Sequence, residues 1–282
     1  MLRTSFFNAM KEGRMNTKDI MERSENQDII DNGVEETSHG IVSDEQYSRL
    51  MDQLRIRLVP TESHLDLLKT AVHKEIEDLS VIVQATIPQK NSTTKRVLVT
   101  ADALDAMEID KEKFLQDAIS ASEKNYPAGM ATLSSFLGAD DGVGFQLYVA
   151  SMADMANGAG VILYPNFMEK AAQELGGDFY VLPSSVHEVL FLRDDGAISL
   201  EELKGIVHSV NQTEVSDEDF LSDNVYHYDA MERKLEIGEK FQERKAHEKE
   251  GRHSVLGELT STRASVKAPV EKAVRNKDEM AI

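Results

Sequence analysis

The feature that most constrains the fold is a repeated order of short apolar, β-branched segments that occur in pairs. Turn-forming residues separate the members of a pair, and a segment with helical periodicity follows, which is typical of a β-hairpin packed against a helix. The predicted strands cover residues 79–87 with 95–101, 145–151 with 159–165, and 179–182 with 186–192. This order predicts an α+β domain with packed helices and a mainly antiparallel sheet built from hairpins.

The first helix is predicted to begin after Ser43. Ser43 and Gln46 match the capping-box pattern, in which the two side chains satisfy each other's backbone amides. The helix is expected to stop at Val59-Pro60, because a residue before proline is disfavoured in the helical region. Its apolar face comprises Tyr47, Leu50, Met51, Leu54 and Leu58. A second helix is predicted over residues 62–77.

Further helices are predicted from their capping residues. Thr100 or Asp102 is expected to begin a short helix, and Asp110 a longer one. A helix in the segment 166–176 is expected to end at Gly176 in the left-handed conformation. Ser199 with Glu202 three residues later predicts one more capping box.

Composition excludes several classes of function. The 282 residues carry a formal net charge of −19 and include no cysteine. The charge disfavours binding to nucleic acid or to an anionic membrane, while it permits a basic partner or mimicry of a polyanion. Without cysteine there is no disulfide, no thiolate zinc site and no cysteine nucleophile. No apolar run approaches the roughly 18 residues of a membrane span, so we expect a cytoplasmic protein.

The distribution of charge and apolar residues predicts three regions. Residues 1–42 are polar and acidic without a sustained period, so they are expected to be largely disordered. Residues 43–237 are expected to form a single α+β domain. Residues 238–282, with 10 basic and 8 acidic residues, are expected to be a charged flexible tail that leaves −21 for the rest of the chain.

Two short motifs, "LPSSVHEV" and "LSDNVYHYD", carry a resemblance to a known family. With the segments 97–128 and 158–192 around them, they make residues 65–230 resemble an uncharacterised bacterial domain family of unknown function. The resemblance implies the family's fold and a setting on mobile elements of anaerobic gut bacteria. Family members carry a longer N-terminal portion that residues 1–60 are not expected to match, so the chain resembles a shortened or diverged member. The family supplies no catalytic residue that can be carried over.

The stretch "FYVLPSSVHEVLFL" contains the candidate catalytic residues Ser184, Ser185, His187 and Glu188. A zinc protease motif would need a second histidine four residues after the first, and that position is Phe191. A hydrolase could use Ser184 or Ser185 with His187, although no G-x-S-x-G motif surrounds the serines. The alternative favoured by the strand period is a structural hairpin, in which a strand from Val186 places His187 and Glu188 on opposite faces.

Asn211, Asp223 and Tyr226 are the candidate binding residues, and a site that joins them with His187 and Glu188 is one hypothesis. No metal site or cofactor is predicted, because the Asp-Asp-Gly turns lack a full calcium loop and the glycine-rich segment lacks a P-loop. The sequence favours a non-enzymatic interaction or regulatory protein of a mobile element, with a protein partner. The alternatives are a hydrolase and an acidic polyanion mimic.

Overall fold

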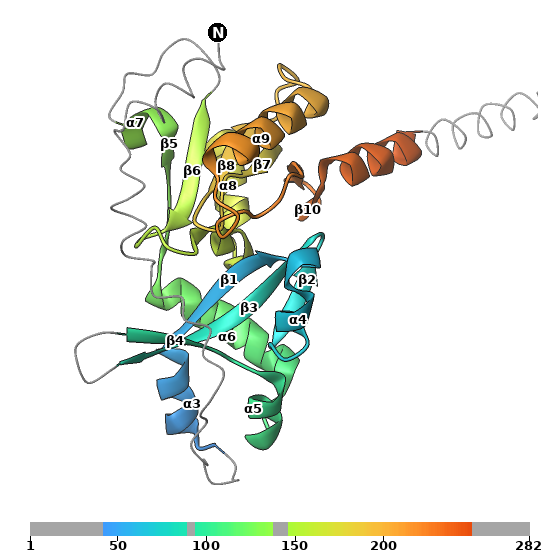
Figure 1. Cartoon of the computed structure of the whole chain (residues 1–282). Helices are drawn as coiled ribbons and strands as arrows, with labels where there is room; N and C mark the ends of the chain where they lie inside the picture. The colour runs from blue at the N-terminus through green and yellow to red at the C-terminus, as the bar shows by residue number, and fades with distance from the viewer. Residues whose placement is uncertain (1–41, 89–93, 138–145, 250–282) are drawn as a thin grey trace, which may run out of the picture. The chain divides into compact units, whose positions relative to one another are not determined.

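The computed structural model describes residues 42–88, 94–137 and 146–249 (Figure 1). The predictions for residues 1–41 and for the tail from residue 250 onward lie outside these segments. By its internal contacts the chain divides into two units, Met1–Gly238 and Glu239–Ile282. Within the described segments, no helix combines the length and the apolar character needed to cross a membrane.

The first unit contains a four-stranded antiparallel sheet, called here the first sheet, in which β3 pairs with the other three strands. Its strands are β1 (Leu54–Pro60), β2 (His73–Ile76), β3 (Leu79–Pro88) and β4 (Thr94–Leu98). The predicted hairpin of residues 79–87 and 95–101 is confirmed as β3 and β4. Because β1 pairs only with β3 in this sheet, its other edge is open to contacts from the rest of the unit.

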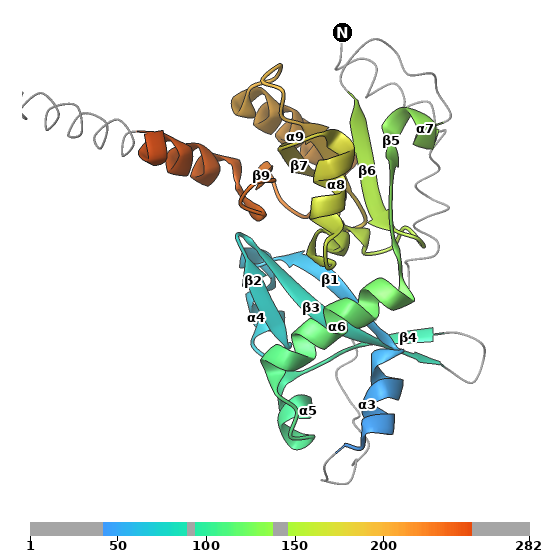
Figure 2. The ribbon, with the colours of Figure 1, turned by 180° about the vertical axis from the view of Figure 1, so that it is seen from behind.

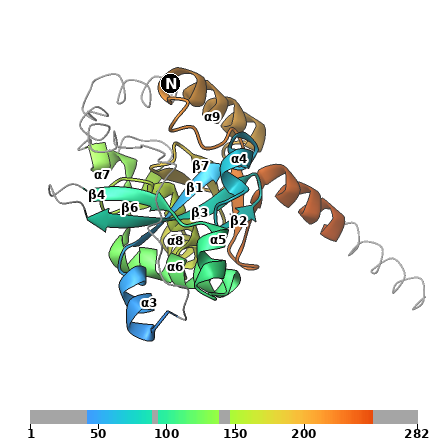
Figure 3. The same ribbon diagram turned by 60° about the horizontal axis from the view of Figure 1, so that its bottom comes forward.

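The helices of this region begin at their predicted caps. These helices are α3 (Asp44–Met51), α5 (Ala101–Ala106) and α6 (Lys111–Asn125). Ser43 forms the capping box with Gln46, while Thr100 and Asp110 accept from the third amide of their helices. Helix α6 lies along one face of the first sheet (Figure 2), and α3 lies beside α6 (Figure 3).

The prediction of one helix through Leu58 is wrong. Helix α3 ends at Met51, and the residues from Leu54 onward form β1. The apolar residues of β1 alternate with Arg55 and Arg57, a period of two that fits a strand. The helical spacing of Leu54 and Leu58 coincides with this period, because residues four apart share a face in both structures.

The prediction of a helix over residues 62–77 is also wrong in its second half. A 3₁₀ turn, η1 (Glu62–His64), and one turn of helix, α4 (Leu65–Leu68), come first. Residues His73–Ile76 then form β2, which pairs with the start of β3. Residues His73–Ile76 are extended and not helical because their backbone pairs with Leu79–Ile82 at the edge of β3.

The second sheet has six antiparallel strands in the order β10-β9-β7-β8-β6-β5. They are β5 (Ala128–Thr132), β6 (Leu147–Met152), β7 (Phe179–Pro183), β8 (Val189–Arg193), β9 (Tyr226–Asp229) and β10 (Lys234–Ile237). Together with the helices, the two antiparallel sheets confirm the α+β class. The sequence patterns did not predict β5 or β10, which lie at the two ends of the strand order.

Residues 159–165 do not form the predicted strand. Residues 159–163 belong to a 3₁₀ helix, η2 (Gly158–Leu163), whose residues are mostly buried. The apolar run reads equally as a buried strand or a buried turn of helix, because burial on all sides removes the periodicity that separates the two. Strand β6, the predicted partner of this segment, therefore pairs with β5 and β8 instead.

Helices α8 (Phe167–Leu175) and α9 (Leu200–Glu214) cover opposite faces of the second sheet. Val189 and Phe191 of β8 belong to the cluster that contains α8, whereas Leu190 and Leu192 belong to the cluster that contains α9. The two helices have the predicted termini: Gly176 is left-handed at φ +82°, and Ser199 forms its capping box. The remaining short helix is α7 (Leu133–Leu137).

The core of the first unit extends from one sheet to the other. Ile56 and Leu58 of β1 pack in one cluster with η2, α8 and the second sheet. Leu54 and Val83 instead pack with α5 and α6. Strand β1 therefore connects two apolar clusters with one of its faces, and its arginines occupy the other face.

In the second unit, residues 239–249 are helical. Arg244 and Lys245 lie over the ring of Phe241, at 5.5 and 5.6 Å from its centroid. Arg244 also donates to Glu248 one turn later, at 3.1 Å. These contacts between residues three and four apart are those expected within a single helix.

Candidate functional site

The segment between β7 and β8 differs from the predicted tight turn. Pro183 pairs with Val189, so residues 184–188 all belong to the connection and β8 begins at Val189 instead of Val186. His187 and Glu188 consequently lie in a loop and not in a strand. Ser185 closes this loop, because its hydroxyl accepts from the backbone N–H of His187 at 3.0 Å and its own N–H donates to the Glu188 carbonyl.

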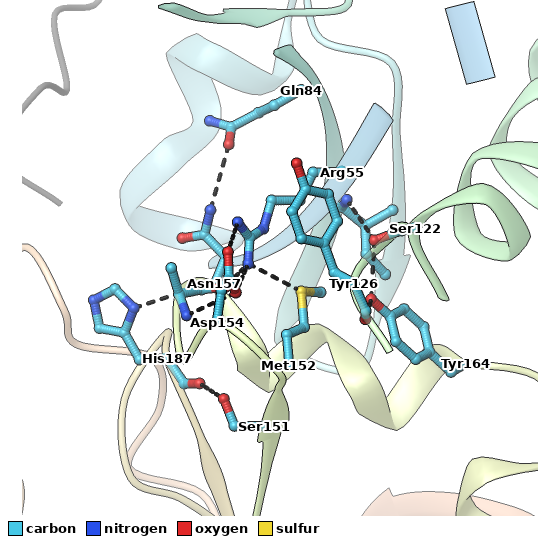
Figure 4. Close-up of polar contacts among 12 residues, drawn as sticks. Arg55, Gln84, Ser122, Tyr126, Ser151, Met152, Asp154, Asn157, Tyr164 and His187 are labelled. Atoms are coloured by element: carbon cyan, nitrogen blue, oxygen red, sulfur yellow. Dashed lines mark hydrogen bonds and ion pairs between the residues drawn. The ribbon is translucent and has the colours of Figure 1, made fainter. Parts of the chain in front are cut away.

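Both ring nitrogens of His187 are hydrogen-bonded, and Figure 4 shows the bond to the Asn157 backbone. Nδ1 accepts the backbone N–H of Asn157 at 3.1 Å, so in the neutral ring the proton lies on Nε2. Nε2 then donates to Oδ1 of Asp219 at 3.1 Å. The hydrogen bond from His187, supported by one from Ser216, holds the pKa of Asp219 below its ordinary value despite partial burial.

Neither Ser184 nor Ser185 is among the described hydrogen-bond partners of the His187 imidazole. Burial raises the pKa of Glu188 above its ordinary value, and the two serine hydroxyls act on that carboxyl group in the opposite direction. A serine nucleophile needs a base within hydrogen-bonding reach of its hydroxyl. His187 has that reach to Asn157 and Asp219 instead, so the described geometry contains no serine–histidine pair.

Arg55 of β1 forms a second polar group beside His187 (Figure 4). Its side chain is 1% exposed, and its guanidinium donates twice to Asp154, at 2.5 and 2.7 Å. It also donates to the Ala156 carbonyl and stacks on Tyr126, with Cζ 4.1 Å from the ring centroid. Burial alone would raise the pKa of Asp154, but the bonds and charge of Arg55 outweigh it and the pKa is lowered.

Residues 153–157, the loop that follows β6, link Arg55 to His187. Met155 and Asn157 have positive φ values of 58° and 52°, a conformation that is costly for residues with side chains. This conformation directs the Ala156 carbonyl to Arg55 and the Asn157 amide to His187. Ser151 completes the connection by donating to the His187 carbonyl at 2.7 Å.

The candidate binding residues form two further contacts. Asn211 donates from its side-chain amide to Oδ1 of Asp223 at 2.8 Å and to the Ser222 carbonyl at 2.9 Å. Tyr226 instead donates to Oδ1 of Asp78 at 2.5 Å. Burial, with the neighbouring Asp78 charge, raises the pKa of the Tyr226 phenol.

Asp78 lies in the turn between β2 and β3 and accepts from the second family motif at three points. Ser222 and Asn224 bond to Oδ2 at 2.6 and 3.0 Å, and Tyr226 bonds to Oδ1. The motif "LSDNVY" thereby ties the start of β9 to the first sheet. Each of its polar residues has a bonding partner that accounts for its position.

Sequence reasoning missed the residues that join these segments: Arg55, Asp78, Asp154, Asn157 and Asp219. The alternation "LRIRLVP" in β1 carried a signal for Arg55, because a strand with one buried apolar face places both arginines on the other. The remaining residues lie in loops, where spacing along the chain does not indicate which side chains meet. Among the described residues, no group of three or more histidine, aspartate or glutamate side chains could hold a metal ion.

One family model matches the chain. It carries the description "Family of unknown function (DUF5688)" and matches residues 2–230. No match was found among curated proteins or among solved structures. Because the match begins at residue 2, the expectation that residues 1–60 fall outside the family is wrong.

Proposed function

The chain belongs to the DUF5688 family of unknown function, and we propose that it is a non-enzymatic interaction or regulatory protein. Its setting on a mobile element, which the family resemblance implies, is part of this proposal. The partner would be a protein that recognises the folded unit or the charged segment after residue 238.

The observation that carries the proposal is the bonding of His187. Its two ring nitrogens are engaged by Asn157 and Asp219, and neither is directed to a serine hydroxyl. A general base must have one nitrogen available to take a proton from the nucleophile. His187 serves instead as a fixed connector between the loop after β6 and the loop before β9.

The motif residues support the same conclusion. Ser222, Asn224 and Tyr226 converge on one carboxylate, that of Asp78, at 2.5–3.0 Å. Such networks position loops, and loops held on a rigid scaffold are the usual carriers of recognition. The arrangement therefore supports a binding surface with little internal motion.

A fluorophosphonate probe tests the hydrolase alternative, because it labels activated serines covalently. We expect no labelling of Ser184 or Ser185 by mass spectrometry, and equal, background turnover of aryl esters by wild type and by Ser185→Ala and His187→Gln variants. Labelling of either serine that is abolished in His187→Gln would contradict the proposal.

The interaction itself is tested by affinity capture from the host bacterium, followed by binding of the purified partner. We expect a saturable complex with the full chain, and comparison with a chain ending at Gly238 shows whether the later segment takes part. If no captured protein binds the purified chain saturably, the interaction role is wrong.

A further inference from the structure

One face of the first sheet gathers three arginines in a chain whose net charge is −19. Arg55 and Arg57 are two apart on β1, so they share a face. Directly paired residues of an antiparallel sheet point to the same side, and Gln84 pairs with both Arg55 and Leu98. Arg96, two residues before Leu98 on β4, therefore lies on this same face.

Among the described residues, Arg55 has a carboxylate as an ion-pair partner and Arg57 has none. Arg55 makes a bidentate ion pair with Asp154. Arg57 is only 7% exposed, and its Nε is buried without a hydrogen-bond partner in the described part of the chain. Buried guanidinium groups are almost always paired, since leaving a charged donor unsatisfied is costly.

The charges around Arg57 do not replace such a partner. Asp219 and Glu218 attract it from outside ion-pair distance, and the Asp219 carboxylate is already bonded to His187 and Ser216. Arg96 and His64 are further basic groups near it. Burial first, and then the charge of Arg96, lower the pKa of Arg57.

The positive charge of Arg96 also lacks an ion-pair partner among the described residues. Arg96 is half-buried, and burial together with the Arg55 charge lowers its pKa, against a weaker attraction from Asp154 and Tyr126. Among the described residues, it makes no ion pair comparable to that of Arg55 with Asp154. Arg57 lies opposite Ile82 and Arg96 opposite Thr86, on the two sides of β3, so the two guanidinium groups share one sheet face. Neither has an anion at ion-pair distance among the described residues.

We propose that Arg57 and Arg96 bind the phosphate group of a phosphorylated ligand on this face of the first sheet. A phosphate monoester carries about −1.5 to −2 charges at neutral pH, which matches two guanidinium groups. Guanidinium forks bond phosphate oxygens in pairs, so the ligand would supply the acceptors that Arg57 Nε lacks. Gln84, on the same face, can add a side-chain amide donor. This site goes beyond the proposed function and does not depend on it.

Calorimetric titration at constant ionic strength, with chloride as the background anion, tests the site. The probes are inorganic phosphate and phenyl phosphate. We expect saturable binding by wild type and by the control Arg49→Gln, which removes an exposed arginine on α3. Arg57→Gln and Arg96→Gln should each weaken binding by about tenfold or more, because each removes charged hydrogen bonds.

The two probes distinguish the sources of the phosphate group. Tighter binding of phenyl phosphate indicates the phosphoryl group of a larger ligand, and tighter binding of inorganic phosphate indicates the free ion; each supports the site. Absence of saturable binding by wild type, or equal affinity in Arg96→Gln and Arg49→Gln, would overturn it. If Arg57→Gln does not fold by circular dichroism, Arg96→Gln alone decides. Release of phenol would contradict the non-enzymatic function and leave the binding site standing.

Discussion

The backbone amide of Asn157 donates to Nδ1 of His187 at 3.1 Å, although the two residues are 30 positions apart in the sequence. Nε2 of the same ring reaches Asp219, a further 32 positions along. One imidazole therefore joins the loop after β6, the β7–β8 loop and the loop before β9. In this structure, the histidine of the first family motif joins three loops through its hydrogen bonds.

The hydrogen bond between His187 and Asp219 should make the stability of the protein depend on pH. The pKa of Asp219 is lowered by folding, so its contribution is present above the ordinary value of about 3.9 and is lost as pH falls through the folded pKa. Asp219→Asn should reduce the free energy of unfolding by roughly 1 kcal/mol at pH 7. The difference from wild type should shrink towards pH 3, as measured by urea denaturation.

The control for that change is Asp217→Asn, two residues away and exposed. It should alter stability by less than about 0.5 kcal/mol at both pH values. An Asp219→Asn effect that is equally large at pH 3 and pH 7 would show that the carboxylate charge plays no part.

Ionisation of Glu188 should make the free energy of unfolding depend on pH in the opposite direction. Burial raises its pKa, so its ionisation opposes folding: stability is highest below the ordinary value of about 4.3 and falls as pH rises towards the folded pKa. Glu188→Gln retains the shape and removes the titration. Relative to wild type, the variant should therefore gain unfolding free energy between pH 4 and pH 7. A relative loss over that range in chemical denaturation would contradict the prediction.

Gly158 is predicted to be irreplaceable by alanine. A Cβ there would lie 1.9 Å from Oγ of Ser151 and 2.2 Å from the His187 carbonyl oxygen. Gly158→Ala should destabilise the protein by about 3 kcal/mol, the upper end for overpacking, because the backbone itself must move. Gly205 in α9 is the matched control, since nothing lies within 4 Å of its Cβ position. Gly205→Ala should stabilise the helix by about 0.5–1 kcal/mol, and thermal unfolding of both variants measures the contrast.

The Arg55–Asp154 pair is predicted to be strongly coupled. Asp154→Ala leaves a guanidinium with 1% exposure without its carboxylate, and should cost roughly 3 kcal/mol. In an Arg55→Met background the same change should cost less than about 1 kcal/mol, because Asp154 itself is 43% exposed.

A double-mutant cycle on Arg49 and Glu45 provides the comparison. Both side chains of that pair are about three-quarters exposed, and their coupling should be about 0.5 kcal/mol or less. Equal coupling energies in the two cycles would refute the burial argument.

Local sequence determined much of the fold. The caps at Ser43, Thr100, Asp110 and Ser199 were predictable, because a cap depends on side chains within three residues of the backbone groups they satisfy. The left-handed end at Gly176 and the β3–β4 hairpin follow from equally local preferences. These elements together were enough to indicate the α+β class.

Tertiary structure decided the rest. Residues 54–58 and 159–165 satisfy more than one local pattern, and pairing with β3 or burial between the sheets selects among them. The sequence motifs contain the polar residues of the candidate site, but they do not indicate which residues bond to them. Asn157, Asp219 and Asp78 reach the two motifs from distances of 30 to 148 residues, and such contacts depend on the packing of whole elements. The sequence by itself determined where helices and hairpins begin, whereas only the packed chain decided that His187 is a connector and that Arg57 lies buried with no anion at ion-pair distance among the described residues.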